Sequence, residues 1–275
     1  MLAGRPKPIA MFLALIFSAL FAFHSCSSAD DALPGTTVRH IHRRGTLLVG
    51  TTGDYRPLSF REASSGKYWG FDIDLAHEFA RRMGVKVDFV PTSWPALSDD
   101  VQASPPLFDL AVCGITITDA RRETMLMSEG YLANGKTILC RTADAARFHS
   151  LADIDRPEVR VMVNPGGLNE KFALEHLSHA SLIVHPKNEE IPSLIAEGQA
   201  DVMVTEITEA PYYVRTDNRL SAPLLDQPFT HGEIGVLMPK GADDLLLLVN
   251  SVIRQMKADG SLRRLHEKYG LVYAY

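Results

Sequence analysis

Apolar and polar positions alternate along this chain in two distinct spacings. Residues 46–51, 85–90 and 107–115 form short apolar runs with the length and composition of buried strands. Residues 38–45 and 74–82 instead carry their apolar side chains at the spacing of a helix. Alternating strands and helices of this kind predict an α/β fold, in which helices cover a parallel sheet on both faces.

The same alternation begins again near residue 159 and predicts a second unit. Strands are expected at residues 159–163, 182–184 and 201–205, and helices at residues 169–179 and 191–197. A long helix is expected at residues 245–258, where Asp259 and Gly260 end it.

The first 29 residues have the pattern of a secretory signal peptide. Arg5 and Lys7 give a basic start, residues 9–23 form an apolar run, and residues 27–29 are small enough for cleavage. Because the run is shorter than the about 20 residues of a membrane span, we expect export and no stable membrane insertion after cleavage. An uncleaved anchor and a lipid anchor on Cys26 are the alternatives. About 246 residues would remain, which favours two lobes over one core.

Composition narrows the possible partners. Cleavage removes two basic residues and no acidic one, so the net charge of −5 becomes about −7, and no basic patch for nucleic acid stands out. Cys113 and Cys140 lie in apolar runs, so we expect two buried free thiols, with a disulfide as the alternative. The chain has no CxxC motif, no His/Cys cluster of metal spacing and no glycine fingerprint for nucleotides. The sequence therefore indicates neither a metal nor a cofactor.

Two segments carry the candidate chemistry. Residues 164–172, with the sequence NPGGLNEKF, place a glycine turn at the start of a helix, where free backbone N–H groups and the helix dipole favour an anion. The candidate cradle consists of Asn164, Gly166, Gly167 and Asn169; an ordinary strand-to-helix turn is the alternative. Residues 205–209, TEITE, add two carboxylates at the end of an apolar strand. Together these segments suit a small organic acid, to bind it or to protonate it.

These segments, with residues 51–55, 70–74, 91–95 and 134–137, closely resemble the periplasmic cyclohexadienyl dehydratases of the solute-binding protein superfamily, family 3. The resemblance extends from Val38 to Leu271. It implies a two-lobed α/β fold of the periplasmic-binding-protein type II, in which the chain crosses between lobes near residues 138–142 and 224–230. The expected lobes are residues 38–137 with 230–275, and residues 138–229. Two crossing segments form a hinge, and the ligand lies between the lobes.

The resemblance also implies an activity. The dehydratases convert prephenate to phenylpyruvate and arogenate to phenylalanine without a cofactor. Glu209 matches their general acid, which protonates the ring hydroxyl as the ring carboxylate leaves as carbon dioxide. Burial in a closed cleft would have to raise the pKa of Glu209 for it to hold this proton. The alternative for Glu209 is a surface carboxylate that starts the helix before Pro211.

Several further positions match the superfamily. Arg121, shortly after Thr116, matches an arginine that clamps a ligand carboxylate with two parallel hydrogen bonds, and we include Thr116 among the substrate-binding residues. The cradle matches closely but departs at Leu168, where the dehydratases carry a threonine. Glu206 replaces the aspartate that commonly holds a ligand ammonium in amino-acid-binding members, so Glu206 serves an enzyme or a receptor equally.

The remaining candidates lie on the expected first lobe or at its border. Asp54 and Lys136 match charged dehydratase positions, and we expect them to pair and to orient the acid and the substrate; a solvated ion pair is the alternative. Trp94, Tyr55 and Phe71 are candidates for the apolar walls of a ring site, with core packing as the alternative.

A second function remains open from the sequence. The same arginine and cradle would serve the substrate-binding protein of an amino-acid ABC transporter, which binds its ligand without turnover. The sequence fixes neither the preference between prephenate and arogenate nor the oligomeric state.

Overall fold

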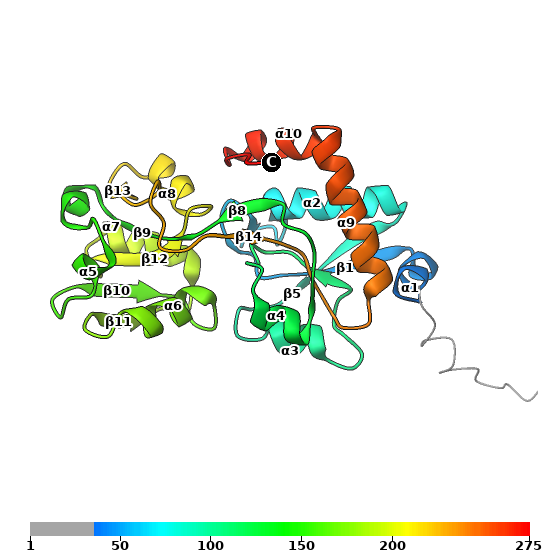
Figure 1. The fold of residues 1–275 in the computed structure, drawn as a ribbon, viewed down its shortest axis with the longest axis horizontal. Helices are drawn as coiled ribbons and strands as arrows, with labels where there is room; N and C mark the ends of the chain where they lie inside the picture. The colour runs from blue at the N-terminus through cyan, green and yellow to red at the C-terminus, as the bar shows by residue number, and fades with distance from the viewer. Residues whose placement is uncertain (1–35) are drawn as a thin grey trace, which may run out of the picture. The chain divides into compact units, whose positions relative to one another are not determined.

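The computed structural model describes residues 36–275 (Figure 1). The predicted signal peptide, including Cys26, lies outside the described residues. The helices are α1 (Thr36–Arg44), α2 (Phe71–Met83), α3 (Leu97–Gln102), α4 (Asp119–Thr124), α5 (Leu151–Ile154), α6 (Leu168–His176), α7 (Ile191–Ala196), α8 (Ala210–Thr216), α9 (Asp243–Ala258) and α10 (Ser261–Tyr269), with the 3-10 helices η2 (Thr142–Arg147) and η3 (Asn188–Glu190). The strands are β1 (Thr46–Thr51), β2 (Asp54–Tyr55), β3 (Ser59–Arg61), β4 (Tyr68–Trp69), β5 (Lys86–Pro91), β6 (Leu110–Ala111), β7 (Leu126–Met127), β8 (Leu132–Asn134), β9 (Lys136–Arg141), β10 (Arg160–Val163), β11 (Ser181–Val184), β12 (Val202–Glu206), β13 (Leu220–Ser221), β14 (Gly232–Ile234) and β15 (Leu237–Met238).

The first sheet has the order β5-β1-β6-β15-β7. Strand β1 pairs in parallel with β5 and β6, whereas β15 runs antiparallel to β6 and β7. The expectation of a wholly parallel sheet is therefore wrong. Strand β15 belongs to the returning chain, which enters the sheet without the crossover helix that a parallel neighbour requires.

Side chains of β1 alternate between two cores. Leu47 and Val49 join the core formed with α1, α2 and α9, whereas Leu48 packs toward Leu97 and Val101 of α3 on the opposite face. Each face of the first sheet is thus covered by helices, as the apolar runs predict.

The second sheet has the order β11-β10-β12-β9-β13. Strand β10 is parallel to β11 and β12, and β9 is antiparallel to β12 and β13. Phe172 of α6 packs with Val202 and Val204 on one face, while α7 and α8 cover Met203 on the other. The two sheets with their separate cores confirm the expected two-lobed α/β architecture.

Two segments connect the sheets. The chain passes from β8 directly into β9 and returns from β13 to β14, and β8 and β14 pair antiparallel to each other (Figure 1). At Gly135, between β8 and β9, a Cβ atom would lie 2.1 Å from the carbonyl oxygen of Thr230, so only glycine fits where the two segments pass. The lobe boundaries given above stay a prediction.

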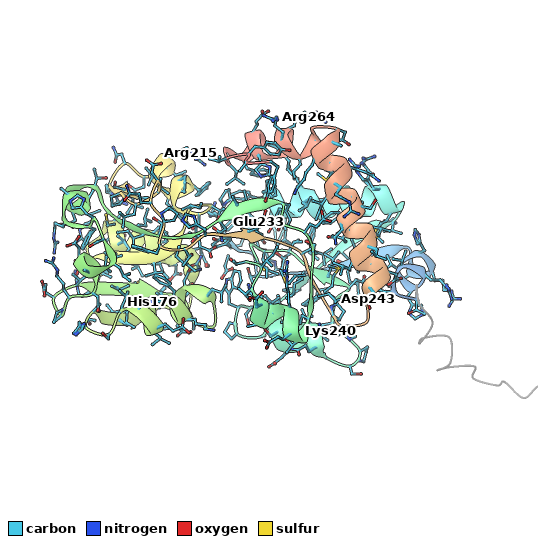
Figure 2. All side chains as sticks on the ribbon, viewed as in Figure 1. His176, Arg215, Glu233, Lys240, Asp243 and Arg264 are labelled. Atoms are coloured by element: carbon cyan, nitrogen blue, oxygen red, sulfur yellow. The ribbon has the colours of Figure 1, made fainter. Side chains whose placement is uncertain are left out.

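Charged side chains lie mostly outside the cores. The six that Figure 2 labels are all exposed: His176, Arg215, Glu233, Lys240, Asp243 and Arg264. Within the described residues, the buried acids are Asp72, Asp201, Glu206 and Glu209, and Lys136 is a buried base. Lys136, Glu206 and Glu209 lie at one end of the pair β9–β12 or just beyond it, so the buried charges concentrate at this end of the second sheet.

Both remaining cysteines are buried and free. Cys113 follows β6 in the first lobe, and Cys140 lies on β9 in the second sheet, so the predicted free thiols are confirmed. Of the described helices, none has the length and apolar character needed to cross a membrane.

Candidate active site

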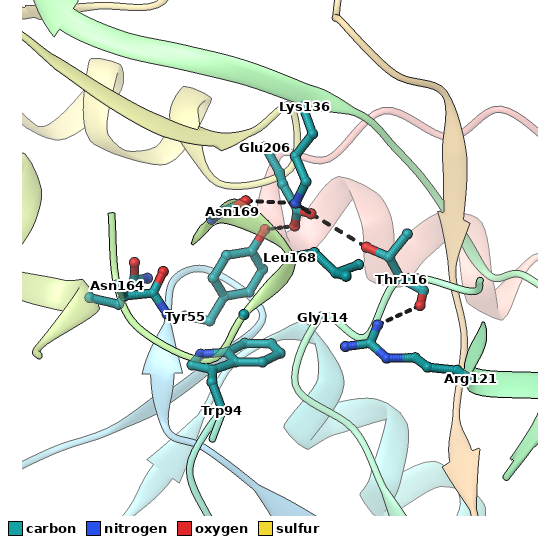
Figure 3. Close-up of a pocket in the computed structure, with 12 residues that line it drawn as sticks. Tyr55, Trp94, Gly114, Thr116, Arg121, Lys136, Asn164, Leu168, Asn169 and Glu206 are labelled. Carbon is teal, nitrogen blue, oxygen red and sulfur yellow. Dashed lines mark hydrogen bonds and ion pairs between the residues drawn. The ribbon is translucent and has the colours of Figure 1, made fainter. Parts of the chain in front are cut away.

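One pocket gathers residues from both lobes. It encloses about 320 Å³ of space, part of it open to solvent (Figure 3). The residues that line it are Tyr55, Trp94, Gly114, Thr116, Arg121, Lys136, Asn164, Gly167, Leu168, Asn169, Asn188 and Glu206. Nine of the twelve positions proposed from the sequence therefore line one pocket, and one more, Glu209, lies behind it.

Lys136 and Glu206 form a buried ion pair in this pocket. The antiparallel register of β9 and β12 places the two residues opposite each other, and Nζ of Lys136 lies 2.5 Å from Oε1 of Glu206. Nζ also donates to Oδ1 of Asn169 at 2.6 Å. The expected pairing of Lys136 with Asp54 is therefore wrong, because the sheet register gives Lys136 a partner on the neighbouring strand.

Glu206 receives two further hydrogen bonds from the first lobe. The hydroxyl of Tyr55 donates to Oε2, and Oγ1 of Thr116 donates to Oε1 at 3.3 Å (Figure 3). Burial alone would raise the pKa of Glu206, but the charge of Lys136 and the hydrogen bonds outweigh burial and hold this pKa below its ordinary value. Glu206 is thus an ionised, fully engaged carboxylate.

Arg121 reaches the pocket from α4. Its Nη1 donates to the carbonyl oxygen of Thr116 at 2.6 Å, which fixes the guanidinium at the pocket wall (Figure 3). Burial lowers the pKa of Arg121. No carboxylate among residues 36–275 forms an ion pair with Arg121, so the guanidinium retains donors for an anion.

Three of the four cradle residues line the pocket: Asn164, Gly167 and Asn169. Gly167 is the N-cap residue of α6 and no side chain caps this helix, so N–H groups of its first turn have no intrahelical acceptor. Gly166 plays a different part. Its N–H donates to Glu170 at 2.7 Å, and a Cβ atom at Gly166 would lie 2.6 Å from the backbone nitrogen of Pro95 in the first lobe. Gly166 therefore allows a close approach of the two lobes and does not contact the pocket.

Glu209 is fully buried at the N-cap of α8. Oγ1 of Thr205 donates to its Oε2 at 2.5 Å, and Nδ2 of Asn188 donates to its Oε1 at 2.8 Å. Burial raises the pKa of Glu209 to about 8 against these two hydrogen bonds, and the negative charges of Glu206 and Asp54 contribute to the rise. The surface alternative for Glu209 is wrong, and the residue lies behind Asn188, which does line the pocket.

Of the aromatic candidates, Trp94 and Tyr55 line the pocket and Phe71 lies in the core, while Asp54 contacts Trp94. Oδ1 of Asp54 accepts from Nε1 of Trp94 at 3.1 Å, and burial raises the pKa of Asp54. Trp94 and Tyr55 line the pocket with their rings edge to face, 6.0 Å between centroids. Phe71 was a wrong candidate for a wall: it is fully buried in the core of the first lobe, stacked on Tyr131.

Sequence reasoning missed Asn188 and Gly114. Asn188 opens η3 after β11, at the carboxyl end of a parallel strand, which is the position where open α/β sheets bind ligands. That topological signal was available, but the polar run around Asn188 gave no motif to single it out. Gly114 has a φ of +76°, and a Cβ atom there would lie 2.4 Å from the ring of Tyr55, so this glycine makes room for the pocket wall.

The charges around the pocket favour an anionic ligand. Its lining contains two cations, Arg121 and Lys136, and one anion, Glu206, which the second cation already neutralises. Across residues 36–275, no group of three or more His, Cys, Asp or Glu side chains is placed to hold a metal ion. The arrangement can bind an organic acid through Arg121 and the start of α6, with Glu209 as a neutral acid behind the wall.

Comparisons with known proteins show the family and the fold of the chain. Residues 47–272 match the model of the bacterial extracellular solute-binding proteins, family 3. The chain is 40% identical to the cyclohexadienyl dehydratase of Pseudomonas aeruginosa over 227 residues, 82% of each protein. It is similar to the crystal structure of the ancestral amino acid-binding protein AncCDT-1, a precursor of cyclohexadienyl dehydratase, with a TM-score of 0.78 and 38% identity over 85% of this chain and 99% of that one. It is also similar to the structure of an ancestral cyclohexadienyl dehydratase, with 50% identity and a TM-score of 0.52 over 84% of this chain and 95% of that one.

Proposed function

This chain belongs to the bacterial extracellular solute-binding proteins, family 3, and from that premise we propose that it acts as a cyclohexadienyl dehydratase. The observation that carries the proposal is Glu209, a fully buried carboxyl group whose pKa is raised to about 8 beside the pocket. A carboxylic acid kept neutral near pH 7 is what general-acid catalysis needs, whereas ligand capture alone has no use for it.

In the proposed reaction Glu209 gives its proton to the ring hydroxyl of prephenate. The C–O bond breaks, and its electron pair leaves with the oxygen as water. The bond between the ring and its carboxylate breaks as well, its electron pair completes the aromatic ring, and carbon dioxide is released. Phenylpyruvate is the product, and Glu209 regains a proton from solvent for the next turnover. The same steps on arogenate give phenylalanine.

The residues that line the pocket would position the substrate. Arg121 would meet one carboxylate of the substrate with two parallel hydrogen bonds, and the start of α6 with Asn164 and Asn169 would hold the other. The rings of Trp94 and Tyr55 supply apolar surface for the six-membered ring. Arg121 is the cation of the lining that no carboxylate pairs with, and the uncapped start of α6 offers a second anion site, so the pocket has two places for the two carboxylates of the substrate.

Lys136 and Asp54 would act by fixing the positions of other side chains in the pocket. Lys136 ties Asn169 of the anion site to Glu206, and Asp54 fixes the indole of Trp94 by its hydrogen bond. Closure of the lobes over the substrate removes water, which strengthens these electrostatic interactions and keeps Glu209 neutral. We place this reaction in the periplasm, in keeping with the export expected from the first 29 residues and with an extracellular family.

The second candidate is the soluble receptor of an amino-acid transporter. It is supported by the similarity to an ancestral amino acid-binding protein, since receptor and enzyme share the fold and much of the pocket. The neutral acid at position 209 favours the enzyme.

A prephenate assay separates the two functions. The purified mature protein is incubated with prephenate, and phenylpyruvate is followed by its ultraviolet absorbance. We expect turnover that Glu209→Gln abolishes while phenylpyruvate still binds. Glu175→Gln, the same change on an exposed residue of α6, is the control and should leave turnover intact. Tight binding of an amino acid without any turnover of prephenate or arogenate would instead identify a receptor.

A further inference from the structure

Asn188 occupies a position between the pocket and the buried acid. It is the first residue of η3, it is only 1% exposed, and it lines the pocket. The Asn188 amide forms hydrogen bonds with two residues that are candidates for catalysis. Glu209 lies behind Asn188, and the backbone of Asp54 lies across from it in the first lobe.

The orientation of the Asn188 amide is determined by two acceptors. Nδ2 donates to Oε1 of Glu209 at 2.8 Å and to the carbonyl oxygen of Asp54 at 3.1 Å, so both of its hydrogens are used. A carbonyl oxygen cannot donate, and Nδ2 is therefore the atom that faces Asp54. Oδ1 must then point elsewhere, and within the described part of the chain it is buried without a hydrogen-bond partner.

A buried carbonyl oxygen without a donor is rare in folded proteins and calls for an explanation. Because Oδ1 belongs to a side chain that lines the pocket, a bound molecule can supply the missing donor. The donor has to lie close to Glu209, since the same amide group hydrogen-bonds that carboxyl group.

We infer that Asn188 is a further substrate-contacting residue, whose Oδ1 accepts a hydrogen bond from the ring hydroxyl that leaves. This inference rests on the proposed function. A hydroxyl that donates its own hydrogen to Asn188 turns a lone pair toward Glu209, which is the arrangement that proton transfer requires. After the transfer the oxygen departs as water, and Oδ1 accepts from that water while the C–O bond breaks.

The bond from Asn188 to Asp54 adds a condition to this role. The amide joins an element of the second lobe to a carbonyl of the first, so this bond exists only when the lobes are closed. Asn188 therefore holds both the acid and the hydroxyl in their reactive arrangement only in the closed, water-poor cleft.

The test compares Asn188→Ala with Asn218→Ala in the mature protein. Asn218 is an exposed asparagine and serves as the matched control. The measured quantities are kcat and KM for prephenate, the inhibition constant of phenylpyruvate, and the pH profile of kcat. Phenylpyruvate lacks the ring hydroxyl, so its binding reports the rest of the pocket without the contact in question.

We expect Asn188→Ala to lower kcat by roughly ten- to a hundredfold and to leave the inhibition constant of phenylpyruvate within about twofold. The basic limb of the pH profile should move to higher pH, because Glu209 loses a donor that favours its anion. Asn188→Asp keeps an acceptor oxygen but adds a negative charge beside Glu209, and it should move this limb further in the same direction. Asn218→Ala should change none of these quantities.

Two results would overturn the inference while the proposed function stands: an unchanged kcat in Asn188→Ala, or a loss of phenylpyruvate binding as large as the loss of kcat. The second result would mark Asn188 as a merely structural residue. A wild-type protein that fails to convert both prephenate and arogenate would overturn the proposed function, and this inference with it. Turnover by the wild type and by Glu209→Gln therefore tests the proposed function. The kinetics of Asn188→Ala test the contact between Asn188 and the ring hydroxyl.

Discussion

Lys136 places its ammonium group 2.5 Å from Oε1 of Glu206, across two neighbouring antiparallel strands. Both side chains are buried, and Glu206 also accepts hydrogen bonds from Tyr55 and Thr116. The carboxylate that could hold the ammonium of an amino acid is thus occupied by an ammonium group of the protein itself. This arrangement favours a ligand that carries carboxylates and no amine.

We therefore expect prephenate to be preferred over arogenate. The amine of arogenate would lose a charge-assisted hydrogen bond worth about 1.5–3 kcal/mol, so kcat/KM should favour prephenate by roughly ten- to a hundredfold. Steady-state kinetics with both substrates measure this ratio. Lys136→Met frees Glu206 and should shift the ratio toward arogenate, and equal rates for the two substrates in the wild type would contradict the explanation.

The same ion pair makes a prediction about stability. Lys136→Met leaves the buried carboxylate of Glu206 without its cation, which should cost about 3–5 kcal/mol of unfolding free energy in urea titrations at pH 7. The double change Lys136→Met with Glu206→Gln removes the uncompensated charge and should recover part of this loss. Lys171→Met is the control, since Lys171 and Glu175 form an exposed pair 3.8 Å apart that contributes less than about 1 kcal/mol.

The raised pKa of Glu209 predicts how activity depends on pH. The acid must be protonated to act, so kcat should be level below neutrality and fall as pH rises through about 8. In the pH–rate profile, a basic limb near the ordinary pKa of 4.5 would contradict a buried acid.

The raised pKa of Glu209 also makes the unfolding free energy of the protein depend on pH. The pKa of this group in the folded protein lies above its ordinary value of 4.5, so the group's contribution to stability is fully present below about pH 4.5 and is lost as pH rises through about 8. Glu209→Gln cannot ionise and lacks this dependence. Urea titrations at pH 5, 7 and 9 should therefore show wild type losing stability relative to Glu209→Gln as pH rises, and a constant difference would exclude titration of Glu209.

Gly166 offers a test of lobe closure. An alanine Cβ there would lie 2.6 Å from the nitrogen of Pro95 across the cleft, so Gly166→Ala should hold the lobes apart and raise KM for prephenate by about tenfold or more. Gly241→Ala is the matched control: its φ of +88° brings similar backbone strain, but no atom lies within 4 Å of the added Cβ. Kinetics and the radius of gyration with bound phenylpyruvate should separate the two variants, and equal effects would show that strain alone is responsible.

The sequence predicted the positions of helices and strands better than the parallel or antiparallel direction of the strands within each sheet. Apolar periodicity located β1 and α9 closely, because burial on one or two faces leaves a direct trace in the spacing of side chains. It could not show that β9 and β15 run antiparallel to their neighbours, since strand direction depends on where the chain crosses between lobes. Only two residues, Leu110 and Ala111, pair as a strand within the apolar run at 107–115.

For the site, the sequence identified residue types and missed pairings. Glu209, Arg121 and most of the cradle were found from motif resemblance, but the partner of Lys136 depends on a strand register that no local motif records. Asn188 was not identified from the sequence for a related reason. A single amide in a polar stretch has no local motif, and its hydrogen bond to Glu209 forms only when the chain folds.

The division of the site between two lobes has a consequence for the order of events. Lys136 and Glu206 lie on paired strands of the second sheet, β9 and β12, and Asn169 lies on α6, which packs on that sheet, so we expect their contacts to survive a separation of the lobes. Tyr55 and Thr116 reach Glu206 from the other side and must part from it when the cleft opens. We therefore expect the start of α6 to receive an arriving acid first, and Arg121 of the first lobe to contact that acid only when the lobes close. Capture of the acid and its clamping by the unpaired cation would then be two successive steps, separated by closure of the lobes.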